Sequence, residues 1–508
     1  MAKFIIAHDL GTTGNKATLF NEEGQCLASS FFGYETYFPD ALAVEQDALS
    51  YWKAVVASTR ELLAKSGVDK EDVAVIAFSG QMMGALPVDE KGNPLYRILI
   101  WADRRSVREV EWVKERIDEE KIYTITGHRL SANYSLAKIL WFRNREKEIY
   151  RKTHKFLLAK DFVLLRLTGK WVTDFSDASG TNLFDLVGET WSEEILSAVD
   201  LPLEKLPTPY PSTQVVGELC KEAQEELGLS RKTLVVVGGG DGACAACGAG
   251  VVREGQAYHY LGSSSWVALA SFRPFYDEGK RTFTFHHLDR GLFMPTGTMQ
   301  SAGGSYQWCR DALCGREKEL ADELEISSYA LMDMEAAKVE AGCENLLFLP
   351  YLMGERAPWW NPRARGAFVG LTPRHRKPHL IRAVLEGVAF NLRIILDVFR
   401  EKDIPIENIR LIGGGARGNF WAQILASVFG MEVLRPLYVE EATSLGAAIC
   451  GGVGAGLYPN LQVAEEMVQI KDRFAPSFQE MEVYDRLYPV FKEAYCALEG
   501  VFEKLSGA

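Results

Sequence analysis

FIIAHDLGTTGNKATLF, residues 4–20, contains the strongest indication of the fold. The apolar runs 4–7 and 17–20 predict two β-strands, and the Gly- and Thr-rich segment 11–15 predicts the turn between them. Glycine lets backbone N–H groups come close to an anion, and short hydroxyl side chains add further donors. The segment therefore predicts a hairpin whose turn can hold a phosphate group, with Asp9 beside it.

The same arrangement returns in the second half of the chain. A strand is predicted over 257–261, a Gly-Ser turn over 262–265 and a second strand over 266–270. At 508 residues the chain is too long for a single hydrophobic core. The faint repeat predicts two related α/β domains that meet near residue 250, an N-terminal one over 1–250 and a C-terminal one over 251–508.

Strands and helices alternate through the rest of the chain, as in an α/β protein. A helix is predicted over 47–65, where Trp52, Val55 and Leu62 recur at helical spacing. Buried strands are predicted over 73–78 and 234–237, and a long amphipathic helix over 378–400 has Pro378 in its first turn.

The composition excludes several classes of protein. The net charge is −12 and no basic tract is interleaved with aromatic residues, so nucleic acid is not expected as a partner. The most apolar long stretch, 234–252, contains Asp241 and several glycines, which does not suit a membrane helix. No signal peptide is apparent, and the nine scattered cysteines are expected to be reduced thiols in a cytoplasmic protein.

Four glycine-rich turns each follow a predicted buried strand. They are HDLGTTGNK from His8, VVVGGGDGA from Val235, LGSSSW from Leu261 and LIGGGARGN from Leu411. Several such turns, two of them with an aspartate, suit a nucleotide site walled by two domains. The last turn also fits the GxGxxG pattern of dinucleotide-binding dehydrogenases, but that reading leaves the Asp9 and Gly262 turns unexplained. The absence of GxxxxGK[ST] excludes a P-loop kinase.

The two aspartates have competing interpretations. Asp9 could hold a hydrated magnesium ion beside phosphates, or it could accept hydrogen bonds from turn amides. Asp241 could cap the helix that follows it, or it could accept the proton of a substrate hydroxyl as a phosphoryl group arrives. The residues alone leave both pairs of interpretations open.

The chain resembles the FGGY carbohydrate kinases, relatives of hexokinase, actin and Hsp70, and within them it is most similar to D-xylulose kinases. The resemblance rests on segments that occur in the family's order over about residues 4–455. They are DLGTTGNK, SGQMMG, KILWF, AKDF, DFSDASGT, GGGDGA, LGSSSW, LPYLMGERAP, IGGGAR and SLGAA. It implies two ribonuclease-H-like domains around a central cleft, with ATP mainly on the C-terminal domain and the sugar mainly on the N-terminal one.

The resemblance also implies roles for individual residues. Asp241 corresponds to the catalytic base and Asp9 to the acidic residue linked to Mg²⁺. The positions implied to contact ATP are Thr12, Thr13, Gly262, Ser263, Gln307, Gly414, Gly415 and Asn419. The positions implied to contact the sugar are Gln81, Met82, Met83, Trp101 and Asp103, together with Asp241.

Three departures from the D-xylulose kinase pattern bear on the substrate. Met83 replaces the histidine of QMHG, Gly242 replaces an asparagine that often follows the catalytic aspartate, and 263–265 read Ser-Ser-Ser where Thr-Ser-Gly is common. The expected reaction is conversion of D-xylulose to D-xylulose 5-phosphate. Kinases of another ketose, a pentitol or tetritol, or an aldonate remain alternatives, because the lost side chains are of the kind that discriminate between hydroxyl groups. A homodimer is compatible with the sequence.

Two other classes of protein share the implied fold. A chaperone- or filament-type ATPase is disfavoured by the sugar-side segments SGQMMG and WADRR, and a sugar-sensing regulator by the lack of DNA-binding helices before the first strand. Glu355 and Arg356 are interpreted as a structural acid–base pair near the cleft. Trp359 and Trp360 are expected to pack in an interface or core more readily than to stack on a sugar.

Overall fold

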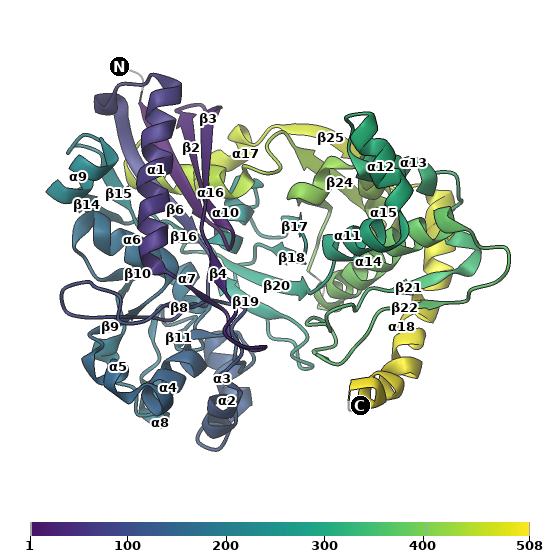
Figure 1. Cartoon of the computed structure of the whole chain (residues 1–508), viewed down its shortest axis with the longest axis horizontal. Coiled ribbons are helices and arrows are strands. Elements are labelled where there is room, and N and C mark those ends of the chain that lie inside the picture. Colours follow the sequence, from purple (N-terminus) through teal and green to yellow (C-terminus); the bar gives the residue numbers. More distant parts are fainter. Residues whose placement is uncertain (1–2, 403, 507–508) are drawn as a thin grey trace.

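The computed structural model describes residues 3–402 and 404–506, which form two lobes, each built on a seven-stranded sheet (Figure 1). In the N-terminal lobe the strand order is β14-β15-β6-β1-β2-β3, and β16 also pairs with β6. The strands are β1 (Phe4–Leu10), β2 (Gly14–Asn21), β3 (Cys26–Gly33), β6 (Val73–Gly80), β14 (Val215–Glu218), β15 (Leu234–Val236) and β16 (Gly239–Gly240).

The C-terminal lobe has the strand order β19-β20-β18-β17-β23-β24-β25. Its strands are β17 (Ala257–Leu261), β18 (Ser265–Leu269), β19 (Phe283–His286), β20 (Phe293–Met299), β23 (Asn408–Ile412), β24 (Glu432–Pro436) and β25 (Ile470–Phe474). The predicted repeat of the two hairpins is confirmed. β1 pairs antiparallel with β2 and parallel with β6, just as β17 pairs antiparallel with β18 and parallel with β23.

The first turn is shorter than the sequence predicts. The ladder between β1 and β2 continues to a pair between Leu10 and Asn15, so that only residues 11–14 remain outside it. The polar side chains of His8 and Asn15 are fully buried and lie 3.0 Å apart, Nδ1 to Nδ2, in a hydrogen bond. Because the ring nitrogens of His8 and the amide nitrogen of Asn15 are hydrogen-bonded inside the protein, these residues do not end the strand where the apolar run ends.

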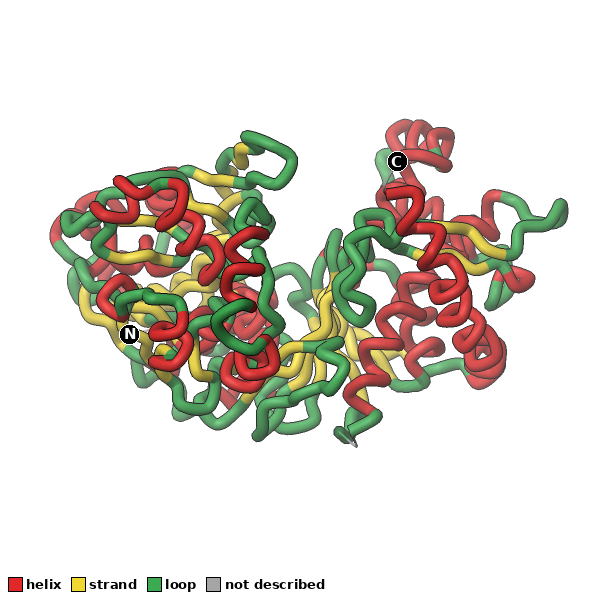
Figure 2. Tube along the Cα trace, turned by 90° about the horizontal axis from the view of Figure 1, so that it is seen from below, coloured by secondary structure: helices red, strands yellow, loops and turns green. Residues whose placement is uncertain are grey.

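Helices cover the outer sides of both lobes, while the strands run through the middle of the molecule (Figure 2). The predicted helix over 47–65 is α1 (Ala48–Ser66), which packs on β2 and β3; Asp47 caps it by accepting a hydrogen bond from the backbone N–H of Leu49. The predicted helix over 378–400 is α14 (Lys377–Arg400), which crosses the core of the C-terminal lobe. Other helices near the two lobes' cores are α4 (Ser135–Arg145), α6 (Ala159–Thr168), α7 (Phe175–Ser179), α11 (Gly303–Leu313), α13 (Ser328–Ala336), α15 (Asn419–Phe429) and α18 (Phe478–Ser506).

Two helices join the lobes. α10 (Asp241–Gly248) packs against α16 (Ala442–Gly454), and α16 also contacts β1 and β6 of the N-terminal sheet (Figure 1). A Cβ atom on Gly446 would lie 1.8 Å from the carbonyl oxygen of Cys244, so this crossing requires glycine. Helix α16, which comes late in the chain, therefore packs against β1 in the core of the N-terminal lobe. The division into 1–250 and 251–508 stays a prediction.

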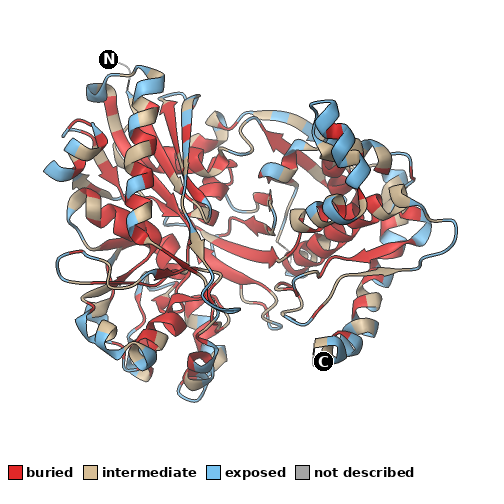
Figure 3. Cartoon of the chain, viewed as in Figure 1, coloured by how far each residue is buried: buried red, intermediate tan, exposed pale blue. Residues whose placement is uncertain are grey.

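Most strands of both sheets are buried, whereas the edge strands β3 and β25 have exposed positions, and the outer faces of the helices are exposed (Figure 3). Cys244 and Cys247 are among the fully buried residues of α10. Within residues 3–402 and 404–506, no helix combines the length and apolar character needed to cross a bilayer.

Candidate active site

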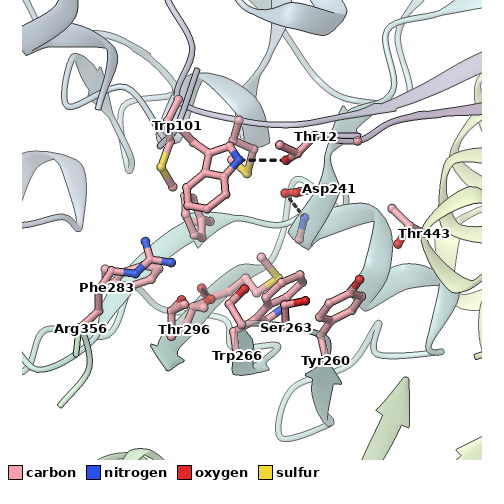
Figure 4. Close-up of a pocket in the computed structure, with 18 of the residues that line it drawn as sticks. Thr12, Trp101, Asp241, Tyr260, Ser263, Trp266, Phe283, Thr296, Arg356 and Thr443 are labelled. Atoms are coloured by element: carbon pink, nitrogen blue, oxygen red, sulfur yellow. Dashed lines mark hydrogen bonds between the residues drawn. The ribbon is translucent and has the colours of Figure 1, made fainter. Parts of the chain in front are cut away.

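A cavity of about 590 Å³ is lined by residues of both lobes. The N-terminal lobe contributes the turn after β1 and the start of α10, and the C-terminal lobe contributes the turn after β17 and the inner faces of β18 and β20. Figure 4 shows the cavity with Asp241 near its middle. The predicted site residues that line it are Asp9, Thr12, Thr13, Met82, Met83, Trp101, Asp241 and Ser263.

Asp241 is the first residue of α10, and Gly240 occupies the N-cap position. The carboxylate therefore does not cap the helix. Its Oδ1 atom accepts a 2.7 Å hydrogen bond from the backbone N–H of Gly242, drawn as a dashed line in Figure 4. Burial, and secondarily repulsion from the charge of Asp9, raise the pKa of Asp241 from 3.8 to about 7. A carboxylate with a pKa near neutrality, facing a cavity, has the properties of a general base.

Asp9 lies one residue before the end of β1 and lines the same cavity. The hydroxyl of Ser79, on the neighbouring strand β6, donates a 3.0 Å hydrogen bond to its Oδ1 atom. Burial raises the pKa of Asp9 to about 6, although Ser79 and the charge of Lys16 act to lower it. Because the charge of Asp9 raises the pKa of Asp241, a cation bound nearby would stabilise both carboxylates as anions.

The carboxylates of Asp9 and Asp241 suit a magnesium ion that is bound together with a nucleotide. No group of three or more His, Cys, Asp or Glu side chains in the described part of the chain is arranged to hold a metal ion. Mg²⁺ usually takes one or two protein carboxylates and completes its shell with water and substrate phosphates. Asp9, beside the Gly11–Thr13 turn, could supply such a carboxylate.

Two hydroxyl-rich turns approach the cavity from opposite lobes. Thr12 and Thr13 line it from the N-terminal lobe, and Ser263 and Ser264 from the C-terminal lobe. The second turn is fixed from behind, because the backbone N–H of Gly303 donates to the carbonyl of Gly262 and those of residues 302 and 304 donate to the carbonyl of residue 263. Backbone amides and hydroxyls on two sides can hold the oxygens of a polyphosphate.

A second cavity, of about 660 Å³, shares Tyr260 and Ser263 with the first. Aromatic side chains and the start of α11 line it, as do the glycines after β23. The predicted nucleotide residues found in its wall are Gly262, Ser263, Gln307, Gly414 and Gly415. The GxGxxG segment thus forms part of a pocket that continues into the one holding the two aspartates.

Asn419 is the one predicted nucleotide residue that lines neither of the two cavities. It begins α15, and its Oδ1 atom accepts a 2.7 Å hydrogen bond from the guanidinium of Arg435. Arg435 also pairs with Asp472 on β25. The amide is therefore held toward β24 and β25, a pairing that depends on tertiary contacts and is not visible in the sequence.

Comparison with family models identifies both halves of the chain. The N-terminal domain of the FGGY family of carbohydrate kinases matches residues 4–248, and the C-terminal domain of that family matches residues 257–455. The chain belongs to the FGGY family of carbohydrate kinases. It is therefore a carbohydrate phosphotransferase that uses ATP, and the predicted fold of the actin and hexokinase type is confirmed.

Similar proteins carry two different substrate names. The chain is 32% identical over 507 residues to gluconokinase of Bacillus subtilis (strain 168), covering 100% of this chain and 98% of that protein. It is also 32% identical over 490 residues to xylulose kinase of Escherichia coli (strain K12), covering 95% of this chain and 98% of that protein. Two solved structures from Lactobacillus acidophilus, a ligand-bound xylulose kinase and a gluconate kinase, each have a TM-score of 0.92 and cover 99% of this chain and 100% of theirs, at 28% and 29% identity.

In this FGGY kinase, Gln81 and Asp103 do not line the cavity, unlike the other predicted sugar-side residues. Gln81 is 3% exposed, and its Nε2 atom donates hydrogen bonds to the carbonyl of Gly11 and to the side chain of Gln46. The buried carboxylate of Asp103 accepts a hydrogen bond from the backbone N–H of Val44 and pairs with Arg105. Both side chains are used to fix the loops around the cavity, so direct contact with a sugar stays only a prediction for them.

Lys138 supports the sugar-side wall of the FGGY kinase, a role that the sequence did not indicate. Its side chain is fully buried, and its ammonium group donates hydrogen bonds to the backbone carbonyls of Met83 (2.7 Å) and Asn133. Burial lowers the pKa of Lys138 to about 7. Met83 has a φ of 65°, in the left-handed region that non-glycine residues rarely adopt. The lysine thus stabilises an unfavourable backbone conformation where Met83 enters the cavity.

Several residues in the wall were missed by the sequence reasoning. Met294, Thr296 and Thr298 occupy alternate positions of β20 and present one face of the strand to the cavity. This alternation with a period of two can be recognised in the sequence once a strand is assigned to these residues. The other missed residues are Tyr258, Tyr260, Trp266, Phe283, Phe285, Arg356 and Thr443.

The residues of the GERAP segment, 354–358, have different roles: some are structural and one lines the cavity. Glu355 is buried and accepts hydrogen bonds from the backbone N–H groups of Gln300 and Arg356, so its structural role is confirmed. Trp359 stacks on Tyr495 with ring centroids 4.0 Å apart, and Trp360 donates its indole N–H to the carbonyl of residue 281. The two tryptophans are partly buried and pack against the hydrophobic cores, as expected. Arg356, in contrast, lines the cavity.

Proposed function

We propose that this chain transfers the γ-phosphoryl group of ATP to a hydroxyl of a small sugar or sugar derivative, with Asp241 as the general base and Asp9 as a ligand of Mg²⁺. The observation that supports the proposal is that two carboxylates of the N-terminal lobe and two hydroxyl-rich turns, one from each lobe, line one cavity. Its volume of about 590 Å³ is in the range of small-molecule sites.

The connected cavities suggest how the two substrates are arranged. The nucleoside would occupy the second cavity, near Gln307 and Gly414, and the triphosphate would extend past Ser263 toward Thr12. The sugar would then lie on the remaining side of Asp241, against Met83 and Trp101. Bound magnesium would neutralise part of the phosphate charge.

Asp241 would orient the acceptor hydroxyl and remove its proton. The bond between the γ-phosphorus and the oxygen bridging it to the β-phosphate breaks, a bond from the hydroxyl oxygen to the γ-phosphorus forms, and ADP leaves. The proton passes to the carboxylate of Asp241 and then to solvent. Because charge spreads over the equatorial phosphoryl oxygens in the transition state, donors from Thr12, Thr13 and Ser263 would stabilise it.

Two substrates are candidates. D-xylulose, converted to D-xylulose 5-phosphate, is the one that the sequence predicts. Gluconate is the second, because the histidine of the D-xylulose kinase pattern is Met83 here and Arg356 lines the same cavity. Similar proteins named for each substrate share 32% identity with the chain, so similarity does not choose between them. A cytoplasmic location and a homodimer stay predictions from the sequence.

The proposal is tested by measuring ADP release with ATP and magnesium against a panel of ketoses, polyols and aldonates. We expect ADP release to depend on one class of acceptor, with a phosphorylated sugar formed in equal amount. ADP release at the same rate with and without every acceptor would contradict the proposal and favour a chaperone- or filament-type ATPase on this fold.

A further inference from the structure

A buried network of polar side chains lies behind the turn that follows β1. Gln46 is fully buried within it and lines neither of the two cavities. Its Nε2 atom donates hydrogen bonds to the carbonyl of Thr12 (2.6 Å) and to the hydroxyl of Thr36 (2.8 Å). Its Oε1 atom accepts hydrogen bonds from the hydroxyl of Tyr51 (2.6 Å) and from Nε2 of Gln81 (2.9 Å). Both N–H donors and both lone pairs of the amide are used, so its orientation is fixed.

The backbone carbonyls of the turn are all bonded to the protein. The carbonyl of Gly11 accepts hydrogen bonds from the hydroxyl of Tyr34 and from Nε2 of Gln81 (3.3 Å). The carbonyl of Thr13 accepts a hydrogen bond from the backbone N–H of Tyr34 (3.2 Å). Together with the bond to the carbonyl of Thr12, these contacts hold three successive carbonyls on the side of the turn that faces the N-terminal lobe.

The N–H groups of the same turn point the other way. In a trans peptide unit, the C=O and N–H bonds lie in one plane and point in opposite directions. The bonds to the carbonyl of Gly11 therefore direct the N–H of Thr12 away from the lobe, and the bond to the carbonyl of Thr12 does the same for the N–H of Thr13. Neither N–H donates to a group within residues 3–402 or 404–506, and both threonines line the cavity. The turn thus presents two unused donors to the cavity.

The γ-phosphoryl group is the part of ATP that these donors fit. In the proposed arrangement the triphosphate extends past Ser263 toward Thr12, so its terminal phosphate lies at this turn. Negative charge spreads over the phosphoryl oxygens during transfer, and donors that are already oriented stabilise it without reorganisation. The indole N–H of Trp101 donates to the Thr12 hydroxyl oxygen (3.0 Å; Figure 4), which leaves the hydroxyl proton available for the same phosphate.

We infer that Gln46 is a positioning residue for phosphoryl transfer: its bond to the carbonyl of Thr12 turns the N–H of Thr13 toward the γ-phosphoryl group. The inference rests on the proposed kinase function and adds a residue that touches neither substrate. Tyr34 and Gln81, the latter expected on the sugar side, act in the same way on the N–H of Thr12. Two side chains hold that peptide unit, whereas among the described residues Gln46 alone holds the next one, so Gln46 is the more sensitive position.

The test uses Gln46→Glu, which keeps the acceptor for Tyr51 and Gln81 but replaces the Nε2 donor with an oxygen. Affinities for ADP and for adenylyl imidodiphosphate, an ATP analogue that resists transfer, are measured by calorimetry with Mg²⁺ and without an acceptor. A hydrogen bond to a charged group changes an affinity by about 10–100-fold. We expect a loss of that size for the analogue and little change for ADP. With the best acceptor of the panel, kcat should fall by a similar factor while KM for that acceptor stays constant.

Gln46→Met, which offers no donor in any protonation state, should give the same difference between the two nucleotides. Gln81→Met should give a weaker one, because Tyr34 still holds the carbonyl of Gly11. The matched control is Gln224→Glu in α9 (Lys221–Leu227). Its Nε2 atom also donates to a backbone carbonyl (2.8 Å), but away from both cavities, so both affinities and kcat should be unchanged.

Two results for the Gln46 variants would overturn the inference. An equal loss of affinity for ADP and for the analogue would mean that Gln46 only supports the fold of the nucleotide site. Wild-type affinities together with a normal kcat would mean that it does not orient the turn. ADP release by the wild type with none of the acceptors would overturn the kinase function instead, whereas the binding measurements still test the role of Gln46.

The wild-type protein supplies an independent measurement. Amide hydrogen exchange in a peptide that contains residues 11–14 should slow when the analogue binds and change little when ADP binds. The physical reason is that the N–H groups of Thr12 and Thr13 gain an acceptor only from the γ-phosphate. Equal protection by the two nucleotides would overturn the inference, including the case in which neither Gln46 variant folds.

Discussion

Asp241 is the residue on which the proposed chemistry depends most. Asp241→Asn preserves the size of the side chain but removes its ability to accept a proton, so kcat should fall by about 10²–10⁴. The affinity for ATP should change little, because the predicted nucleotide contacts lie on other residues. Steady-state ADP release and calorimetric titration with ATP measure the two quantities. The control is Asp397→Asn in α14, whose carboxylate contacts Tyr488 away from the cavity. Full turnover in Asp241→Asn would show that Asp241 is not the general base.

The raised pKa of Asp241 predicts two pH dependences. A general base works only when deprotonated, so kcat/KM should fall as the pH drops through about 7, and Asp241→Asn should lack this limb. The folded pKa lies above the unfolded one, so wild-type stability should decline as the pH rises from about 4 to about 7. Asp241→Asn carries no charge at this position. The melting temperature of the variant minus that of the wild type should therefore be more positive at pH 8 than at pH 5. An equal difference in melting temperature at both values would contradict the raised pKa.

At the scale of elements, a buried hydrogen-bonded chain supports the turn that carries Asp241. Lys160 lies 3.0 Å from Asp174, and both side chains are fully buried. The hydroxyl of Ser176 donates to Asp174 and accepts a 2.9 Å hydrogen bond from the backbone N–H of Gly240. Helices α6 and α7 are thereby connected to the start of α10. Ser176 acts on the chemistry only through this backbone position, so we regard it as a positioning residue.

Ser176→Ala should leave the N–H of Gly240 buried without a partner, at a cost of about 1–3 kcal/mol. We expect kcat to decrease while KM for ATP stays constant, because only the orientation of Asp241 is loosened. Ser212→Ala is the matched control, since its hydroxyl also donates to Asp174 but does not contact Gly240. Equal effects of the two substitutions on kcat would mean that Ser176 matters only for stability.

The sequence predicted elements better than side-chain directions. Apolar periodicity located both hairpins, α1 and α14 to within a few residues, and the glycine turns marked both sides of the cavity. It could not show that Gln81 turns toward Gln46, or that Asn419 pairs with Arg435, because these partners are distant in the chain. Arg356 was missed as a site residue because an arginine beside a glutamate suggests an ion pair. In the structure, Glu355 instead accepts hydrogen bonds from backbone N–H groups.

At the scale of the whole molecule, the site depends on how two similar lobes are held together. The turns that approach the phosphates belong to opposite sheets, so a small change in lobe orientation alters the distance between them. The packing of α10 on α16 is one contact that fixes this orientation, and α10 also carries Asp241. Stability and catalysis should therefore be coupled at this helix crossing.

Gly446→Ala tests that coupling. The added methyl group would lie 1.8 Å from the carbonyl oxygen of Cys244, a backbone atom that cannot rotate away, so the helices must separate. Overpacking of this kind costs about 1–3 kcal/mol or more. We expect a lower melting temperature together with a lower kcat, even though Gly446 does not line the cavity. Gly500→Ala in α18 is the matched control: nothing lies within 4 Å of its new Cβ atom, so it should stabilise the helix by about 0.5–1 kcal/mol and leave kcat unchanged. A Gly446→Ala variant with normal kcat would show that the crossing of α10 and α16 does not set the geometry of the site.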